Sequence, residues 1–110
     1  MLTEQKCVPC EGGLPPMPDT QEDEYIKQIK DWNLERTIIH KLKKELKFKK
    51  YEDTIAAVNK IAEIANSENH HPVLHVYYGK IEIELWTHAV KGLSINDFIL
   101  AAKIDVAFSS

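Results

Sequence analysis

Histidines gather in one short stretch of the chain. Four of the five fall within 19 residues, at His70, His71, His75 and His88. Imidazole titrates near pH 6.5, so it can both donate and accept protons near neutral pH. Several imidazoles around one substrate suit a reaction that needs an acid and a base together. The sequence therefore favours proton-transfer chemistry.

The densest feature is His70-His71-Pro72, in a predicted loop between a helix and a strand. Proline restricts the residue before it to extended conformations. Adjacent extended residues point in opposite directions, so we expect His70 and His71 to have different roles.

We expect His88 at the end of a strand, on the polar face that it shares with Trp86. If segments 73–78 and 80–88 form a hairpin around Gly79, the start of the first strand lies about one interstrand spacing, ~5 Å, from the end of the second. This topology predicts one site that contains His70, His71 and His88. The alternative is that each histidine decorates the surface or makes a local hydrogen bond, and we interpret His40 and His75 in that way.

Other residues that could take part in chemistry are interpreted as structural. Adjacent histidines in an extended chain are a poor ligand pair because their rings diverge, so we predict no metal site. Cys7 and Cys10 form a C-x-x-C pattern, but Pro9 lies inside it and prolines and glycines follow. We interpret it as an inert irregular segment, with metal or redox chemistry as the alternative. Asp97 follows Ser94 in an S-x-x-D pattern that caps helices, and a role near His88 is compatible with capping.

These residues must be positioned by a fold that the hydrophobic pattern predicts. Residues 1–19 form an irregular N-terminal arm and residues 20–110 a single domain. The predicted elements are a helix from Thr20 to near Asp31, strands over 32–37 and 38–48, a helix over 51–66, strands over 73–78 and 80–88, and a helix from Ser94. The α-β-β-α-β-β-α order predicts an α+β fold of two layers, a four-stranded antiparallel sheet with helices packed on one face.

Alternation and helical spacing predict which side chains enter the core. In strand 38–48 the even positions Ile38, Leu42, Leu46 and Phe48 point one way, and in strand 80–88 the odd positions do. The predicted helical stripes are Ile55, Val58, Ala62 and Ala65, and Ile95, Phe98, Ile99, Ala102 and Val106.

The composition of the chain argues against some classes of binding partner. The net charge of −3 and the pI near 5.9 argue against nucleic acid. Neither an apolar stretch of ~20 residues nor a signal peptide is visible, so we expect no membrane segment and a cytoplasmic location. A four-stranded sheet leaves edge strands, and pairing of strand 38–48 with its copy predicts a homodimer or homotetramer.

The motifs Asn69-His70-His71-Pro72, Tyr78, Thr87-His88, Gly92-Leu93 and Asn96-Asp97-Phe98 resemble those of the pterin-4a-carbinolamine dehydratase family. The resemblance covers about residues 20–108. It implies a lyase that converts 4a-hydroxytetrahydrobiopterin to quinonoid dihydropterin and water, in recycling of the pterin cofactor used by an aromatic amino acid hydroxylase.

For the site, the resemblance implies catalytic His70, His71 and His88. Substrate binding is assigned to His71 and Asp97 and to Trp86, which shares the face of His88. Neither a metal nor a redox cofactor is expected. One departure is Asn66, where the family usually has a charged residue. Some relatives act as dimerisation or assembly cofactors, so a protein-interaction module with little or no dehydratase activity is the alternative, with helix 51–66 as its surface.

Overall fold

A computed structural model of the chain describes residues 2–8 and 14–109. Its elements are α1 (Asp19–Tyr25), β1 (Asn33–Glu35), β2 (Lys41–Lys47), α2 (Tyr51–Glu68), β3 (Val73–Tyr77), β4 (Lys80–Leu85) and α3 (Ile95–Ala107). Short 3-10 turns cover Leu2–Glu4, Ile26–Gln28 and His88–Val90. The predicted α-β-β-α-β-β-α order is confirmed.

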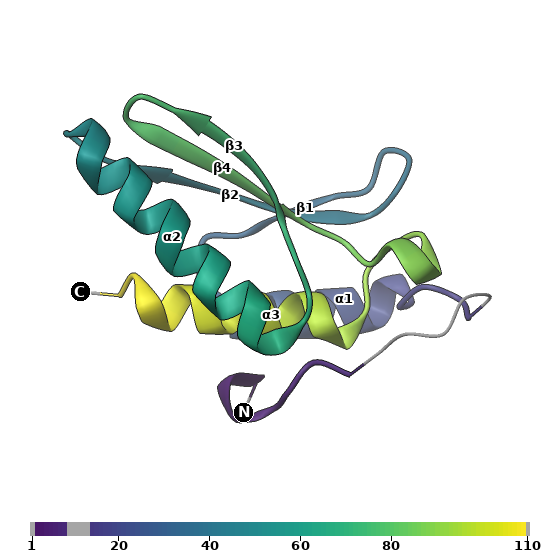
Figure 1. Cartoon of the computed structure of the whole chain (residues 1–110). Coiled ribbons are helices and arrows are strands. Elements are labelled where there is room, and N and C mark those ends of the chain that lie inside the picture. The colour runs from purple at the N-terminus through teal and green to yellow at the C-terminus, as the bar shows by residue number, and fades with distance from the viewer. Residues whose placement is uncertain (1, 9–13, 110) are drawn as a thin grey trace.

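One antiparallel sheet, in the order β1-β2-β4-β3, forms one layer, and the helices cover one of its faces (Figure 1). The predicted α+β class is therefore confirmed. Ile81, Ile83 and Leu85 alternate along β4 and are fully buried, because every second side chain of a strand faces the helices. They pack with Phe98 and other side chains of α3 in one core. None of the helices in the described residues is long and apolar enough to cross a bilayer.

The second strand is shorter than predicted. β2 begins at Lys41, and Ile38 lies in a bend with 92% of its surface exposed, so its predicted place in the core is wrong. β4 pairs with β2 along nearly its whole length on one side, and β1 pairs with Lys41–Lys43 on the other, so β2 does not offer the full-length edge that was predicted to pair with its copy. The free edges of the sheet belong to β1 and β3.

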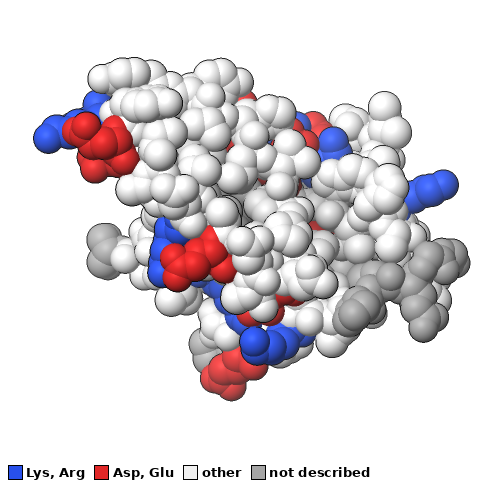
Figure 2. All heavy atoms as spheres, in the orientation of Figure 1, with Lys and Arg blue, Asp and Glu red and all other residues white. Residues whose placement is uncertain are grey.

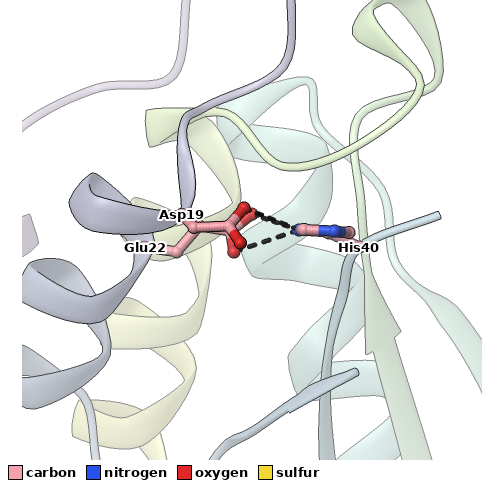
Figure 3. A group of neighbouring side chains, drawn as sticks. All are labelled: Asp19, Glu22 and His40. Atoms are coloured by element: carbon pink, nitrogen blue, oxygen red, sulfur yellow. Dashed lines mark hydrogen bonds and ion pairs between the residues drawn. The ribbon is translucent and has the colours of Figure 1, made fainter. Parts of the chain in front are cut away.

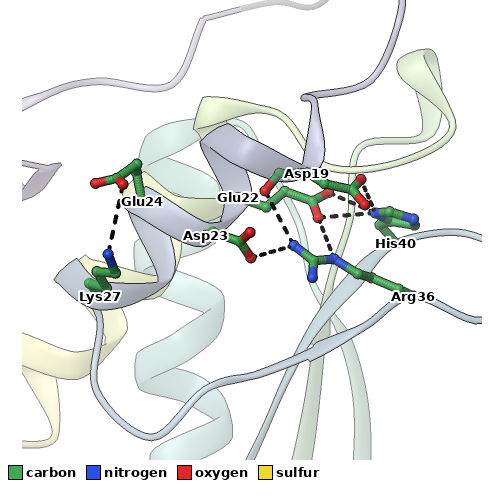
Figure 4. Close-up of polar contacts among 7 residues, drawn as sticks. All are labelled: Asp19, Glu22, Asp23, Glu24, Lys27, Arg36 and His40. Atoms are coloured by element: carbon green, nitrogen blue, oxygen red, sulfur yellow. Dashed lines mark hydrogen bonds and ion pairs between the residues drawn. The ribbon is translucent and has the colours of Figure 1, made fainter.

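The chain bends there because a buried carboxylate on α1 holds it. Glu22 is fully buried, and it accepts hydrogen bonds from Nε of Arg36 at 2.9 Å and from Nδ1 of His40 at 2.8 Å. Arg36 also reaches Asp23, and Asp19 lies beside His40 (Figures 3 and 4). A buried carboxylate requires such partners. The network therefore fixes the connection between β1 and β2 against α1.

Helical spacing predicted the core faces only in part. On α2 the buried residues are Thr54, Ala57, Ile61, Ala65 and Glu68, whereas of the predicted stripe only Ala65 is fully buried. On α3, Val106 is 62% exposed and Ile104 is buried. In both helices, apolar residues occupy two adjacent faces, and the pattern did not show which face would meet the sheet.

The fourth strand also ends early. β4 stops at Leu85, Thr87 forms an isolated bridge with Gly92, and His88 begins a 3-10 turn, so the predicted strand end at His88 is wrong. Thr87 is still buried, as the alternation predicted. The chain leaves the sheet at this point and leads through the 3-10 turn to the start of α3.

We predict that Ile83→Ala lowers the free energy of unfolding by about 2–5 kcal/mol, because it removes fully buried methyl groups and leaves a cavity. Ile38→Ala is the matched control: the same change at a 92% exposed side chain should cost under about 0.5 kcal/mol. Urea unfolding followed by circular dichroism measures both. Equal losses would contradict the placement of Ile38 outside the core.

Candidate active site

His70 is held by a buried carboxylate on another element. Its Nε2 lies 2.7 Å from Oδ1 of Asp97, which is on the first turn of α3 and is fully buried. The side chain of His70 is 13% exposed. If Nε2 carries the proton toward Asp97, Nδ1 keeps its lone pair, so the imidazole has one fixed nitrogen and one free for proton transfer.

The other carboxylate oxygen of Asp97 secures the segment after β4. Oδ2 accepts hydrogen bonds from the hydroxyl of Thr87 at 2.7 Å and from the backbone N–H of Ser94 at 3.0 Å. The second bond is part of a capping box, so the predicted capping role of Asp97 is confirmed. One side chain thus joins the start of α3, the loop after α2 and the residue before His88.

His71 has a different partner. Its Nε2 lies 3.0 Å from Oδ1 of Asn66, one turn back on α2, and both residues are exposed. The helix ends here because Asn69 takes a left-handed conformation, with φ of 51°, while the His70 N–H still donates to the Ala65 carbonyl. The two adjacent histidines therefore meet a buried carboxylate and an exposed amide, respectively.

His88 is exposed and contacts Trp86. The two ring centroids are 5.4 Å apart in an edge-to-face arrangement, and the ammonium of Lys41 lies 5.7 Å from the Trp86 ring centroid. Thr87 lies between them in the chain and bonds to Asp97. The loop with His70 is therefore tied, through Asp97 and Thr87, to the segment that presents Trp86 and His88.

Sequence analysis missed two contributors to this arrangement. Thr87 was named as part of the Thr87-His88 motif and predicted to face inward, but no role was assigned to its hydroxyl, which supports Asp97. Asn66 was noted as a departure from a family pattern, and its contact with His71 gives it a place beside the site. The sequence signal for Thr87 was a hydroxyl residue predicted to face inward, directly before a histidine predicted to face outward.

The remaining histidines lie elsewhere. His75, on the outer face of the sheet, is bonded to Glu84 at 2.8 Å, and His40 is bonded to Glu22. Burial acts to raise the pKa of Glu84, but hydrogen bonds from His75 and Lys41 outweigh it, so that this pKa lies below its usual value. Both histidines make local polar contacts, as expected of structural residues.

Among the described residues, one group could offer three ligand atoms to a metal ion. It consists of Asp19, Glu22 and His40, whose candidate atoms all lie within 4.8 Å of one another (Figure 3). Glu22, however, already accepts a hydrogen bond from the Arg36 guanidinium, a cation that would repel a metal ion at the same carboxylate. We interpret the group as an ion-pair network.

The thiol of Cys7 is half-buried beside the end of α2. Burial, and then the nearby carboxylate of Glu68, raise its pKa to about 12, so the group is a neutral thiol near pH 7. The thiolate is the reactive form of cysteine. This agrees with the interpretation of Cys7 as inert; Cys10 lies outside the described residues.

The sequence matches the model of the pterin 4 alpha carbinolamine dehydratase family over residues 15–107. The chain belongs to this family. A protein of Nitrosospira multiformis is 45% identical over 97% of this chain and 92% of its own length, and one of Halorhodospira halophila is 40% identical over 94% of each chain. Both are named, provisionally, pterin-4-alpha-carbinolamine dehydratase.

Solved structures share the fold of this family member. A transcriptional coactivator/pterin dehydratase from Brucella melitensis superposes with a TM-score of 0.79 at 19% identity, over 86% of this chain and 99% of the other. A pterin dehydratase-like protein, described as a RuBisCO assembly factor in the alpha-carboxysome, gives 0.62 at 22% identity, over 74% and 94%. At these identities the likeness is one of fold.

We predict that Cys7 resists alkylation in the folded protein, because its raised pKa leaves little thiolate. Iodoacetamide labelling at pH 8 of a Cys10→Ser background, followed by mass spectrometry, should show much slower modification than in 8 M urea. The same background in urea is the control for intrinsic reactivity. Equal rates in both solvents would show that Cys7 is accessible and reactive.

Proposed function

We propose that the protein is a hydro-lyase that dehydrates 4a-hydroxytetrahydrobiopterin to quinonoid dihydropterin, the activity for which its family is named. The observation that carries the proposal is the 2.7 Å contact between His70 and the buried Asp97, made beside the segment that presents His88. A paired imidazole and carboxylate is a common support for general acid–base catalysis.

The reaction needs two proton transfers. The bond between C4a and its hydroxyl oxygen breaks, and the oxygen leaves as water after it gains a proton. The neighbouring ring nitrogen N5 loses its proton, and its electron pair forms the new double bond to C4a. The electrons stay within the ring, so the reaction requires neither an external oxidant nor a reductant. Each transfer assisted by a positioned side chain gains about 10²–10⁴ in rate.

We assign the two transfers to His70 and His88. Asp97 holds the His70 ring in place through the 2.7 Å contact between its Oδ1 and Nε2 of the imidazole. The buried carboxylate of Asp97 meets protein groups on both oxygens, so we place it as the residue that positions His70 rather than in contact with the pterin. His71 and Trp86 would bind the ring, with Asn66 orienting His71.

We predict that His70→Ala and His88→Ala each lower kcat at least ~100-fold, because each removes one general acid–base step. His71→Ala should mainly raise KM, because we assign it to binding. The measurement is the dehydration of enzymatically generated 4a-hydroxytetrahydropterin, followed by absorbance.

His75→Ala is the matched control, since it makes the same change at a histidine on the outer face of the sheet, away from Asp97. It should retain wild-type kcat and KM. A His70→Ala or His88→Ala protein that is folded and turns over normally would remove that residue from the mechanism.

A protein-interaction module is the second candidate, and the surface of α2 favours it. Ile55 and Val58 are only partly covered and Ala62 is exposed. The face that α2 presents in Figure 2 is mostly free of charged side chains. One solved relative is described as a coactivator and another as an assembly factor. A purified chain without dehydratase activity would favour this candidate.

We also propose that the chain forms a homodimer or homotetramer through the free edge of β3, which carries the half-exposed Val76 and Tyr77. Light scattering at micromolar concentration should give at least twice 12.6 kDa. Val76→Lys should reduce the mass toward that of one chain, whereas Val106→Lys, on an exposed part of α3, should not. A wild-type mass of one chain would contradict the proposal.

A further inference from the structure

The N-terminal arm contacts both helix ends that carry the candidate site. The backbone N–H of Cys7 donates to Oε1 of Glu68 at 3.0 Å, at the end of α2. Val8 binds the side chain of Asn96 twice: its N–H donates to Oδ1 at 3.0 Å, and its carbonyl accepts from Nδ2 at 2.6 Å. Figure 1 shows this arm on the helical side of the molecule, below the end of α2.

The residues that the arm holds are direct neighbours of the site. Glu68 lies two residues before His70, and Asn96 immediately precedes Asp97. Both side chains are buried, with exposed fractions of 7% and 3%. Because His70 and Asp97 sit on different elements, the distance between them depends on how the end of α2 docks on the start of α3.

Glu68 adds a second tie between the same helices. Its Oε2 accepts a 2.6 Å hydrogen bond from Lys103, which lies further along α3. Burial acts to raise the pKa of Glu68, but the hydrogen bonds from Lys103 and the Cys7 N–H outweigh it, and this pKa lies below its usual value. The carboxylate is therefore charged near pH 7 and holds both the arm and α3.

We propose that residues Cys7–Val8 act as a clamp that positions the His70–Asp97 pair, with Asn96 and Glu68 as its positioning residues. The clamp works through backbone groups and two buried side chains, not through the thiol, which is neutral and donates only a long contact of 3.5 Å to the Asn96 carbonyl. Its effect on turnover rests on the proposed function; its effect on the geometry of His70 does not.

Small displacements at such a pair have large consequences. A misplacement of about 1 Å in a catalytic group can cost roughly 10²-fold in rate. A catalytic side chain keeps its geometry only when the residues around it are themselves fixed by packing and hydrogen bonds. The arm supplies two such bonds at Asn96, which lies in the first turn of α3 next to Asp97.

A pair of substitutions at Val8 separates the backbone contact from the side chain. Val8→Pro removes the N–H that donates to Asn96, whereas Val8→Ala keeps it and shortens a side chain that is 59% exposed. We expect Val8→Pro to lower kcat at least ~10-fold with little change in KM. Val8→Ala and Cys7→Ser should stay within about twofold of the wild type.

A second variant and a spectroscopic readout keep the test independent of Val8 and of turnover. Asn96→Ala removes both contacts from the other side and should reproduce the loss in kcat. The ¹⁵N shifts of the His70 imidazole report which nitrogen carries the proton. We expect them to change in Val8→Pro and Asn96→Ala, and to stay as in the wild type in Val8→Ala.

Two results would overturn the clamp: wild-type kcat in Val8→Pro, or a loss of activity that follows melting temperature alone while the His70 signals stay unchanged. A wild-type chain without dehydratase activity would overturn the proposed function instead. In that case the His70 signals of the four variants still decide whether the arm positions the pair.

Discussion

The buried carboxylate of Asp97 is the constraint around which this end of the molecule is arranged. A charge removed from water is stable only if polar groups replace its hydration, and Asp97 is fully buried. Its partners come from three places: His70 after α2, Thr87 after β4, and the Ser94 N–H at the start of α3. The need to satisfy one side chain thus brings together segments that the sheet ladder does not connect.

The same principle operates at two other points. Glu22 on α1 gathers Arg36 and His40, and so sets where β2 begins. Glu68 gathers the Cys7 N–H and Lys103, and so joins the arm, α2 and α3. The apolar core brings the helices onto the sheet, but the hydrophobic effect that drives this packing is non-directional. Directional bonds to buried carboxylates fix what the core leaves adjustable, and one of them is at the candidate site.

The alternation of β4 was sufficient to predict the sheet, because Ile81, Ile83 and Leu85 follow the two-residue period of a half-buried strand. The same rule failed at Ile38. The apolar alternation includes Ile38, but the hydrogen bond between His40 and Glu22 holds the chain before β2 outside the sheet. Local sequence carries no information about such a partner. The α2 stripe failed for a related reason: two neighbouring faces are apolar, and docking selects between them.

The candidate site likewise combines features that local sequence predicts with contacts that it does not. The histidines were visible as a cluster, and Asp97 was visible as a cap, since both are signals within a few residues. The contact between His70 and Asp97 spans 27 residues and depends on how α2 docks against α3. The sequence was compatible with a role of Asp97 near His88; the structure pairs Asp97 with His70 and with Thr87, and sets His88 beside Trp86.

The different supports of His70 and His71 explain how two adjacent imidazoles can do different work. The ring of His70 is fixed by a buried carboxylate that is itself held by Thr87 and the Ser94 N–H. The ring of His71 has one nitrogen fixed by a single hydrogen bond to the exposed amide of Asn66. These supports fit the division of roles that we propose, in which His70 transfers a proton and His71 binds the pterin through a hydrogen bond. The two partners, a buried carboxylate and an exposed amide, therefore distinguish two adjacent side chains for which the sequence showed only the restriction that Pro72 places on His71.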